Sequence, residues 1–194
     1  KLLADTYLRM GQPEKALGTL RPLLERGQRD AAALSIAGQA YLATGRPIDA
    51  EGMFTAAAKL KPGDILVRTA LAMTDLAKGN APAAFDALQT IASQDSGDAA
   101  DQVLISAHLR RQEFDAALKA IDHLAAKMPT APGPLHLRGV TLRGKGETEA
   151  ARAAFEQALK LAPKHIVSTA ALVSLDLQER KLDQAKARIE AVVA

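Results

Sequence analysis

Residues 37–62 read AGQAYLATGRPIDAEGMFTAAAKLKP, and residues 138–163 read RGVTLRGKGETEAARAAFEQALKLAP. The two stretches lie 101 residues apart and share two glycines, an alanine, a phenylalanine and a closing proline at the same offsets. Self-similarity at a fixed offset is the signature of a repeat architecture, in which one structural unit is written several times.

The repeat recurs six times along the 194 residues, at spacings of 33 or 34. Each copy has a turn position, usually glycine, then an alanine five residues later and a large apolar residue four residues after that. The turn positions are Gly11, Gly45, Gly79, Gln112, Gly146 and Arg180. The alanines are Ala16, Ala50, Ala84, Ala117, Ala151 and Ala185. The apolar residues are Leu20, Phe54, Leu88, Ile121, Phe155 and Ile189.

Each copy predicts two short helices. In the second copy, LSIAGQAYLA and DAEGMFTAAAKL both place apolar or small residues three and four apart, and TGRP interrupts them. Gly45 suits the end of the first helix, and Pro47 suits the first turn of the second. Because the turn is short, the two helices are expected to be antiparallel neighbours. The repeated alanine is expected where two helices cross closely, with the large apolar residue filling the adjoining gap.

Composition excludes several other classes of protein. Hydrophobic residues make up 48 % of the chain, but aromatic residues only 3 %, which favours closely packed helices over a β-sandwich. The net charge of +3 is spread without a basic stripe, so nucleic acid is not expected as a partner. The chain has no cysteine and no apolar run of the roughly 20 residues that a membrane span needs. Both ends interrupt a helical pattern, so a fragment of a longer protein is expected.

These features resemble the tetratricopeptide repeat (TPR) family, whose unit is a helix–turn–helix of 34 residues. The resemblance implies an all-α fold, a right-handed superhelical solenoid of antiparallel helix pairs in one continuous array over 1–194. The expected repeats cover 1–30 (partial), 31–64, 65–97, 98–131, 132–165 and 166–194 (partial). The family's small-residue slot in the first helix holds Ala4, Gly38, Ala72, Ile105, Gly139 and Val173. Its tyrosine slot holds Tyr7, Tyr41, Asp75, His108, Leu142 and Asp176.

The sequences of some repeats, such as LLADTYLRMGQPEKAL and ISAHLRRQEFDAALKAID, resemble those of the TPR-repeat lipoproteins of bacterial PEP-CTERM/exosortase systems. Those proteins accompany exopolysaccharide export, so this resemblance implies a scaffold in the bacterial cell envelope, in the periplasm and lipid-anchored outside this fragment. Two alternatives stay open: a scaffold that contacts glycan directly, and a regulatory TPR segment attached to an enzyme domain elsewhere in the protein. The scarcity of aromatic residues argues against sugar stacking.

No catalytic, metal or cofactor site is predicted. The four histidines, at 108, 123, 136 and 165, have no metal-ligand spacing. GVTLRGKG at 139–146 resembles the start of a phosphate-binding loop but has Gly146 where the magnesium-binding Ser or Thr belongs. Asp75 and Asp176 are unusual, because a half-buried aromatic is normal in that slot. We expect them to be structural, either bound to a neighbouring donor or left in contact with water.

The family resemblance implies that the stacked first helices line a concave groove that binds a peptide or protein partner. Counting from the interface slots predicts the groove residues Ser35, Gln39, Thr69, Met73, Gln102, Ser106, His136, Val140 and Arg143. The lysine, asparagine and arginine set with which chaperone-binding family members clamp a terminal carboxylate is missing. The groove is therefore expected to bind apolar anchors, with a mild basic patch at Arg110, His136 and Arg143. The prediction is a non-catalytic protein–protein interaction scaffold.

Overall fold

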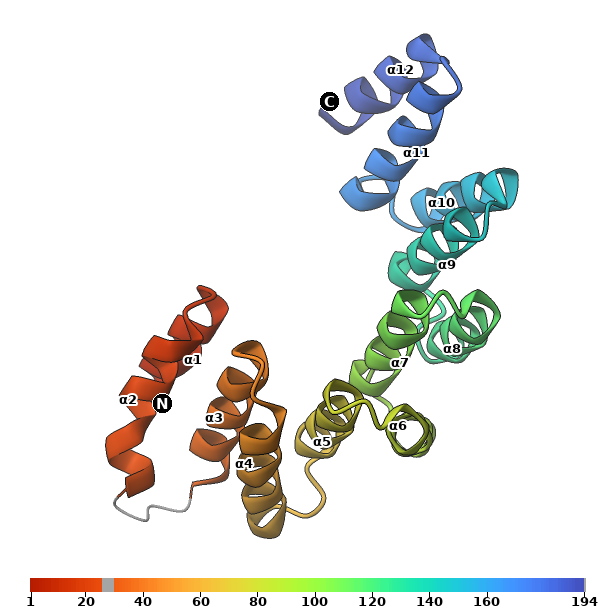
Figure 1. Cartoon of the computed structure of the whole chain (residues 1–194). Helices are drawn as coiled ribbons and strands as arrows, with labels where there is room; N and C mark the ends of the chain where they lie inside the picture. The colour runs from red at the N-terminus through yellow and green to blue at the C-terminus, as the bar shows by residue number, and fades with distance from the viewer. Residues whose placement is uncertain (26–29, 194) are drawn as a thin grey trace. The chain divides into compact units, whose positions relative to one another are not determined.

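The computed structural model describes residues 1–25 and 30–193, which form twelve α-helices and no strand (Figure 1). The chain divides into two compact units, Lys1–Val103 and Leu104–Ala194, with the boundary inside α7. The helices of unit 1 are α1 (Leu2–Arg9), α2 (Pro13–Glu25), α3 (Ala31–Ala43), α4 (Pro47–Leu60), α5 (Ile65–Ala77) and α6 (Ala81–Gln94). They are followed by α7 (Ala99–Arg110), α8 (Phe114–Lys127), α9 (Pro132–Gly144), α10 (Thr148–Leu161), α11 (Ile166–Gln178) and α12 (Leu182–Val193).

Within each unit, successive helices form hairpins. Figure 1 shows the two helices of a pair lying antiparallel, for example α3 with α4 and α9 with α10. In unit 1, the first helices of the pairs, α1, α3 and α5, also contact one another in order. Each of the expected repeat ranges contains one hairpin. The all-α fold class of helix pairs is confirmed, whereas the prediction of one continuous array stays a prediction.

The turn inside each hairpin has a left-handed residue at its centre. Gly45 has φ +71°, and Arg46, the residue after it, donates its backbone N–H to the Tyr41 carbonyl over 2.9 Å. This bond closes the end of the first helix in the way typical of a Schellman motif. The other glycine turns have φ between +68° and +87°. Gln112 and Arg180 have φ +58° and +60°. Residues other than glycine rarely adopt this left-handed backbone conformation.

The repeated alanines lie at buried helix crossings, as expected. The first five are fully buried and Ala185 is 3 % exposed. The large apolar residues four positions later are fully buried in the first five repeats, but Ile189 is 51 % exposed. The difference arises because, among the described helices, α12 packs mainly against α11, which leaves Ile189 at the surface.

The small-residue slot and the large apolar slot are complementary in volume. Gly38 contacts the ring of Phe54, and a Cβ added at position 38 would lie 2.7 Å from two ring carbons. Gly139 meets Phe155 still more closely. Where the first slot holds alanine, as at Ala72, the second holds leucine. Ile105, which departs from the family pattern, is buried and packs against Ile121 and Leu124. The departure at this slot therefore leaves the hairpin of α7 and α8 closely packed.

Candidate functional site

In unit 1, the exposed residues of α3 and α5 occupy the same three repeat slots. They are Ala32, Gln39 and Ala43 on α3, and Leu66, Met73 and Ala77 on α5. We call these six residues the unit 1 face. Their spacing of seven and four places them along one side of each helix. None of them is charged, and α3 has no charged residue at all.

Of the predicted groove residues in this unit, Gln39 and Met73 belong to the unit 1 face, and Met73 is 41 % exposed. Ser35 is half-buried, and its hydroxyl donates to the Ala31 carbonyl over 2.8 Å. Thr69 is 4 % exposed, and its hydroxyl has no hydrogen-bond partner among the described residues. Gln102 is exposed and donates from Nε2 to Asp98. The structure thus places Gln39 and Met73 at the surface of α3 and α5, leaves Ser35 half-buried and buries Thr69.

The predicted groove residues of unit 2 are Ser106, His136, Val140 and Arg143. Ser106 and Arg143 are exposed, whereas His136 and Val140 are half-buried. Val140 packs against the core cluster that contains Phe155 and Leu172. His136, Val140 and Arg143 lie on one side of α9, because they are four and three residues apart.

His136 is part of a cluster that also contains His165 and Ser168. The Nδ1 atoms of His136 and His165 lie 3.1 Å and 2.8 Å from the same hydroxyl oxygen, that of the fully buried Ser168. The two imidazole rings are 5.6 Å apart and nearly perpendicular, and the His136 ring lies 5.4 Å from that of Phe155. Burial of the ring, the nearby His165 and the charge of Arg143 together lower the pKa of His136 below its ordinary value of 6.5.

Helix α11 carries exposed apolar residues that are not among the predicted groove residues. Val167 and Leu177 are each 52 % exposed, and Ala170 between them is also exposed. They form a stripe with the half-buried Ser174 on one side of α11. Val167 and Leu66 both lie thirteen residues before a turn position, so the repeat register contained the signal. We call Val140, Arg143, Val167, Ala170 and Leu177, with the half-buried His136, the unit 2 face.

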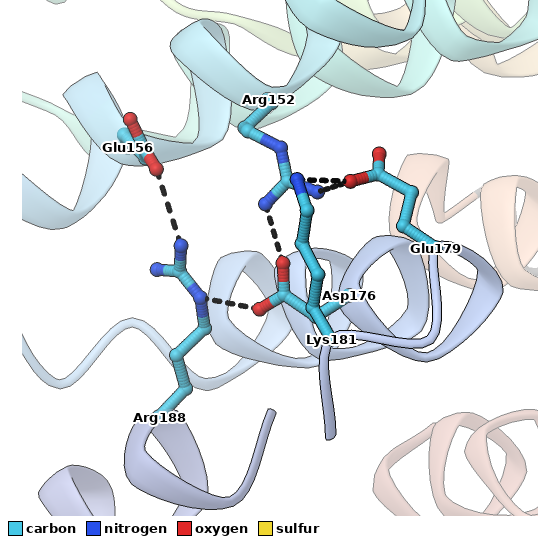
Figure 2. Close-up of polar contacts among 6 residues, drawn as sticks. All are labelled: Arg152, Glu156, Asp176, Glu179, Lys181 and Arg188. Carbon is cyan, nitrogen blue, oxygen red and sulfur yellow. Dashed lines mark hydrogen bonds and ion pairs between the residues drawn. The ribbon is translucent and has the colours of Figure 1, made fainter. Parts of the chain in front are cut away.

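Asp176 has a structural role, as expected. It is fully buried, and Figure 2 shows two arginines converging on its carboxylate. Arg152 of α10 binds one oxygen at 2.5 Å, and Arg188 of α12 binds the other at 2.7 Å. Burial opposes ionisation of Asp176, but the bonds and charges of the two arginines outweigh it, so its pKa lies below 3.8. Asp176 thus joins three helices and is not accessible to a ligand.

Asp75, in the same repeat slot, is partly exposed. Its side chain is 32 % accessible and lies 3.4 Å from Lys78 Nζ. Both aspartates are therefore bound to neighbouring cations, and Asp75 also remains in contact with water.

Within residues 1–25 and 30–193, no group of three or more histidine, aspartate or glutamate side chains is placed to hold a metal ion. None of the described helices is long and apolar enough to cross a membrane.

Sequence profiles of the tetratricopeptide repeat match residues 1–65 and 132–165, which together make up just over half of the chain. The chain belongs to the tetratricopeptide repeat family. Among curated proteins, none matches it significantly. No comparison supports the narrower resemblance to PEP-CTERM/exosortase lipoproteins, which stays a hypothesis.

Many solved structures share the TPR fold of this chain. A thermophilic TPR protein from Thermus thermophilus is 23 % identical, with a TM-score of 0.60 over 84 % of this chain and 90 % of its own. A tetratricopeptide repeat protein from Parabacteroides merdae is 15 % identical, with a TM-score of 0.66 over 98 % of this chain and 76 % of its own. YrrB, a TPR protein described as having an unusual peptide-binding site, is 20 % identical, with a TM-score of 0.56 over 87 % of each chain. At these identities the similarity establishes the fold.

Proposed function

We propose that this TPR chain is a non-catalytic scaffold that binds extended or helical segments of partner proteins on the exposed sides of its first helices. The observation that carries the proposal is the unit 1 face. Three matching slots on two successive helices are exposed and uncharged, and they include Leu66, which is 69 % exposed, and Met73. A regular array of exposed apolar and small residues on a rigid support suits recognition of a partner's apolar side chains.

The second helices of unit 1 provide a contrast. Their surfaces carry charged residues, among them Asp49, Glu51 and Lys59 on α4, and Glu51 forms an ion pair with Lys78. Charged surfaces keep a protein soluble, whereas contiguous uncharged patches mark interaction sites. The peptide-binding site in the description of YrrB agrees with a peptide as the class of ligand.

Binding at the unit 1 face should depend weakly on salt, because no charge of this face takes part. Burial of apolar area should give a negative heat-capacity change. A location in the bacterial cell envelope, as part of an exopolysaccharide export system, is our hypothesis for where the scaffold acts. Sequencing of the full coding region tests this hypothesis, since a signal peptide followed by a lipidated cysteine would fix the compartment.

The binding proposal can be tested with peptides selected from a random 15-residue display library on the purified chain. Selection at pH 7.5 and 500 mM salt favours peptides that bind without charge pairs, and calorimetry on these peptides at 50 mM and 500 mM salt should give similar affinities. Met73→Asp should abolish the binding, while Gln89→Asp, at an exposed position of the second helix α6, should leave it unchanged. The proposal fails if Met73→Asp binds as tightly as the original chain or if no peptide is retained.

A further inference from the structure

The unit 2 face differs from the unit 1 face in charge. Helix α9 contains His136, Arg138 and Arg143 but no acidic residue, and Arg138 is already bound to Asp122 of α8. The only acidic residue within α11 is Asp176, which is fully buried. The surface formed by α9 and α11 therefore presents cationic groups and apolar side chains without an exposed carboxylate of its own.

Among the described residues of α9, Arg143 is the exposed arginine, whereas Arg138 is half-buried. Arg143 forms no ion pair with any residue in the described part of the chain. It lies two helical turns from His136, with Val140 between them on the same side of α9. A guanidinium in this setting suits the carboxylate of a partner, which it can bind through two parallel hydrogen bonds.

The second cationic group would be His136 in its protonated form. Its Nδ1 shares the hydroxyl of Ser168 with the Nδ1 of His165. The hydroxyl has one hydrogen, so it donates to one neutral imidazole and accepts from the N–H of the other. Burial of the His136 ring, then the nearby His165 and the charge of Arg143, oppose a proton on His136, so its pKa lies below the ordinary value of 6.5 in the unbound protein.

No other helix in the described ranges supplies the missing negative charge. From α10, the residue that faces His136 is Phe155, and the nearby Arg152 and Glu156 are held by Asp176 and Arg188. From α8, Asp122 binds Arg138. A carboxylate brought by a partner would therefore be the acidic group next to His136.

We propose that the unit 2 face is a proton-linked docking site for an acidic amphipathic segment of a partner protein. Carboxylates of the segment bind Arg143 and protonated His136, and its apolar side chains pack on Val140, Val167 and Leu177. The proposal rests on the proposed function, because it assumes that the first helices bind partner segments, and it adds the chemistry of the partner.

The linkage has a definite sign. A carboxylate favours the protonated form of His136, so the bound complex holds more protons than the free protein near pH 6. Binding must then tighten as the pH falls from 7.5 to 5.5, by at most about tenfold per pH unit for one proton. The partner's glutamates remain ionised over this range, because their ordinary pKa is about 4.3.

The experiment uses the purified chain and two matched arrays of 15-residue peptides. Each peptide has leucines three and four positions apart, and the remaining positions include glutamates in the first array and glutamines in the second. We expect the glutamate array to contain binders at pH 5.5 that weaken at least about fivefold at pH 7.5, within the limit for one proton. We expect their glutamine counterparts to bind at least about tenfold more weakly, as for loss of a charge-assisted pair.

Three variants locate the effect. Arg143→Gln should remove the preference for glutamate, and His136→Gln should remove the pH dependence while retaining a hydrogen-bonding side chain for Ser168. Lys160→Gln, which removes an exposed charge from the second helix α10, should change neither. Circular dichroism checks that each variant is folded, and the surface position of Arg143 makes Arg143→Gln the decisive one.

The result also separates this proposal from the proposed function. Binding that is independent of pH and of Arg143 but is lost in Met73→Asp would overturn the proton-linked site and leave the scaffold function standing. Equal binding of both arrays to the original chain and to Arg143→Gln overturns it as well. Absence of binding from both arrays overturns the proton-linked site, and failure of the random library in addition overturns the scaffold function.

Discussion

Asp75 in unit 1 and Asp176 in unit 2 lie 101 residues apart in the same repeat slot, and their surroundings have opposite charges. The position of Glu51 near Asp75 corresponds to that of Arg152 near Asp176, and Lys78 corresponds to Glu179. Both pairs of corresponding residues form ion pairs, Glu51 with Lys78 at 2.9 Å and Arg152 with Glu179 at 3.0 Å, with reversed polarity.

The charge of the neighbouring residues determines whether each aspartate is buried or partly exposed. In unit 2, Arg152 and Arg188 both turn to Asp176 and allow it to be buried. In unit 1, Ala87 takes the position of Arg188 and Glu51 that of Arg152, so among the described residues Asp75 pairs with Lys78 and its side chain stays 32 % exposed. An aspartate in this normally aromatic slot can therefore be buried only when neighbouring repeats supply side chains that pair with its charge.

The largest effect is expected for Asp176→Ala. It leaves Arg152 and Arg188 without their buried counter-charge, and breaking a buried pair from one side costs about 3–5 kcal/mol. Denaturant unfolding should show this loss, with hydrogen exchange increasing in α10, α11 and α12. The matched substitution Asp75→Ala should cost far less. Equal losses at the two positions would contradict the comparison.

Gly139→Ala should have the next largest effect. The added Cβ would collide with the ring of the fully buried Phe155, and overpacking of a core costs about 1–3 kcal/mol. Adding Phe155→Leu should restore part of the stability, because alanine with leucine is the combination found at Ala72 and Leu88 in unit 1. A double-mutant cycle from urea unfolding measures this coupling. Additive losses would show that the two slots are independent.

Acid should destabilise unit 2 more than unit 1. All four histidines belong to unit 2, and the folded-state pKa of His136 lies below 6.5. Neutral His136 thus contributes stability that is present above pH 6.5 and is lost as the pH falls through its folded pKa. Amide exchange at pH 7 and pH 5 should show the loss in α9 and α11, with α3 and α5 as the internal reference. His136→Gln should remove this component.

A smaller, stabilising effect is expected for Gln112→Gly. All three turn positions of unit 1 are glycines, whereas unit 2 has Gln112 and Arg180 at two of its three. Glycine relieves the left-handed strain but costs chain entropy, so the net gain should be about 0.5–1 kcal/mol. Thermal unfolding measures it, and Gly45→Ala in unit 1 is the reverse control. A loss of stability in Gln112→Gly would mean that its side chain stabilises the turn.

The smallest effect is expected for Asp75→Asn. An exposed ion pair such as Asp75 with Lys78 contributes about 0–1 kcal/mol, and Lys78 keeps its bond to Glu51. Urea unfolding should therefore hardly change, and added salt should remove what difference there is. A loss as large as that of Asp176→Ala would show that Asp75 becomes buried in solution.

Much of the fold could be predicted because the same pattern of turn, alanine and large apolar residue occurs six times in the sequence. The fixed spacing of the turn position and the alanine defined every hairpin, and the burial of Ala50 and Ala151 follows from it. The faces were predicted only in part. The predicted groove residues included Met73 and Arg143. They did not include Leu66, seven residues before Met73, or Val167 on α11, a helix for which no groove residue was predicted. The prediction also placed Thr69 at the surface, where the structure buries it.

The sequence by itself determined the family, the helix pairs and the positions of the crossings, because these depend on local periodicity, turn chemistry and side-chain size within one repeat. The tertiary structure decided the polar contacts. Asp176 is bound by arginines that lie 24 and 12 residues away in the sequence. Ser168, whose hydroxyl contacts His136, lies 32 residues from that histidine. The periodicity of the sequence does not predict these polar contacts, since they depend on which side chains of neighbouring repeats meet when the helices pack.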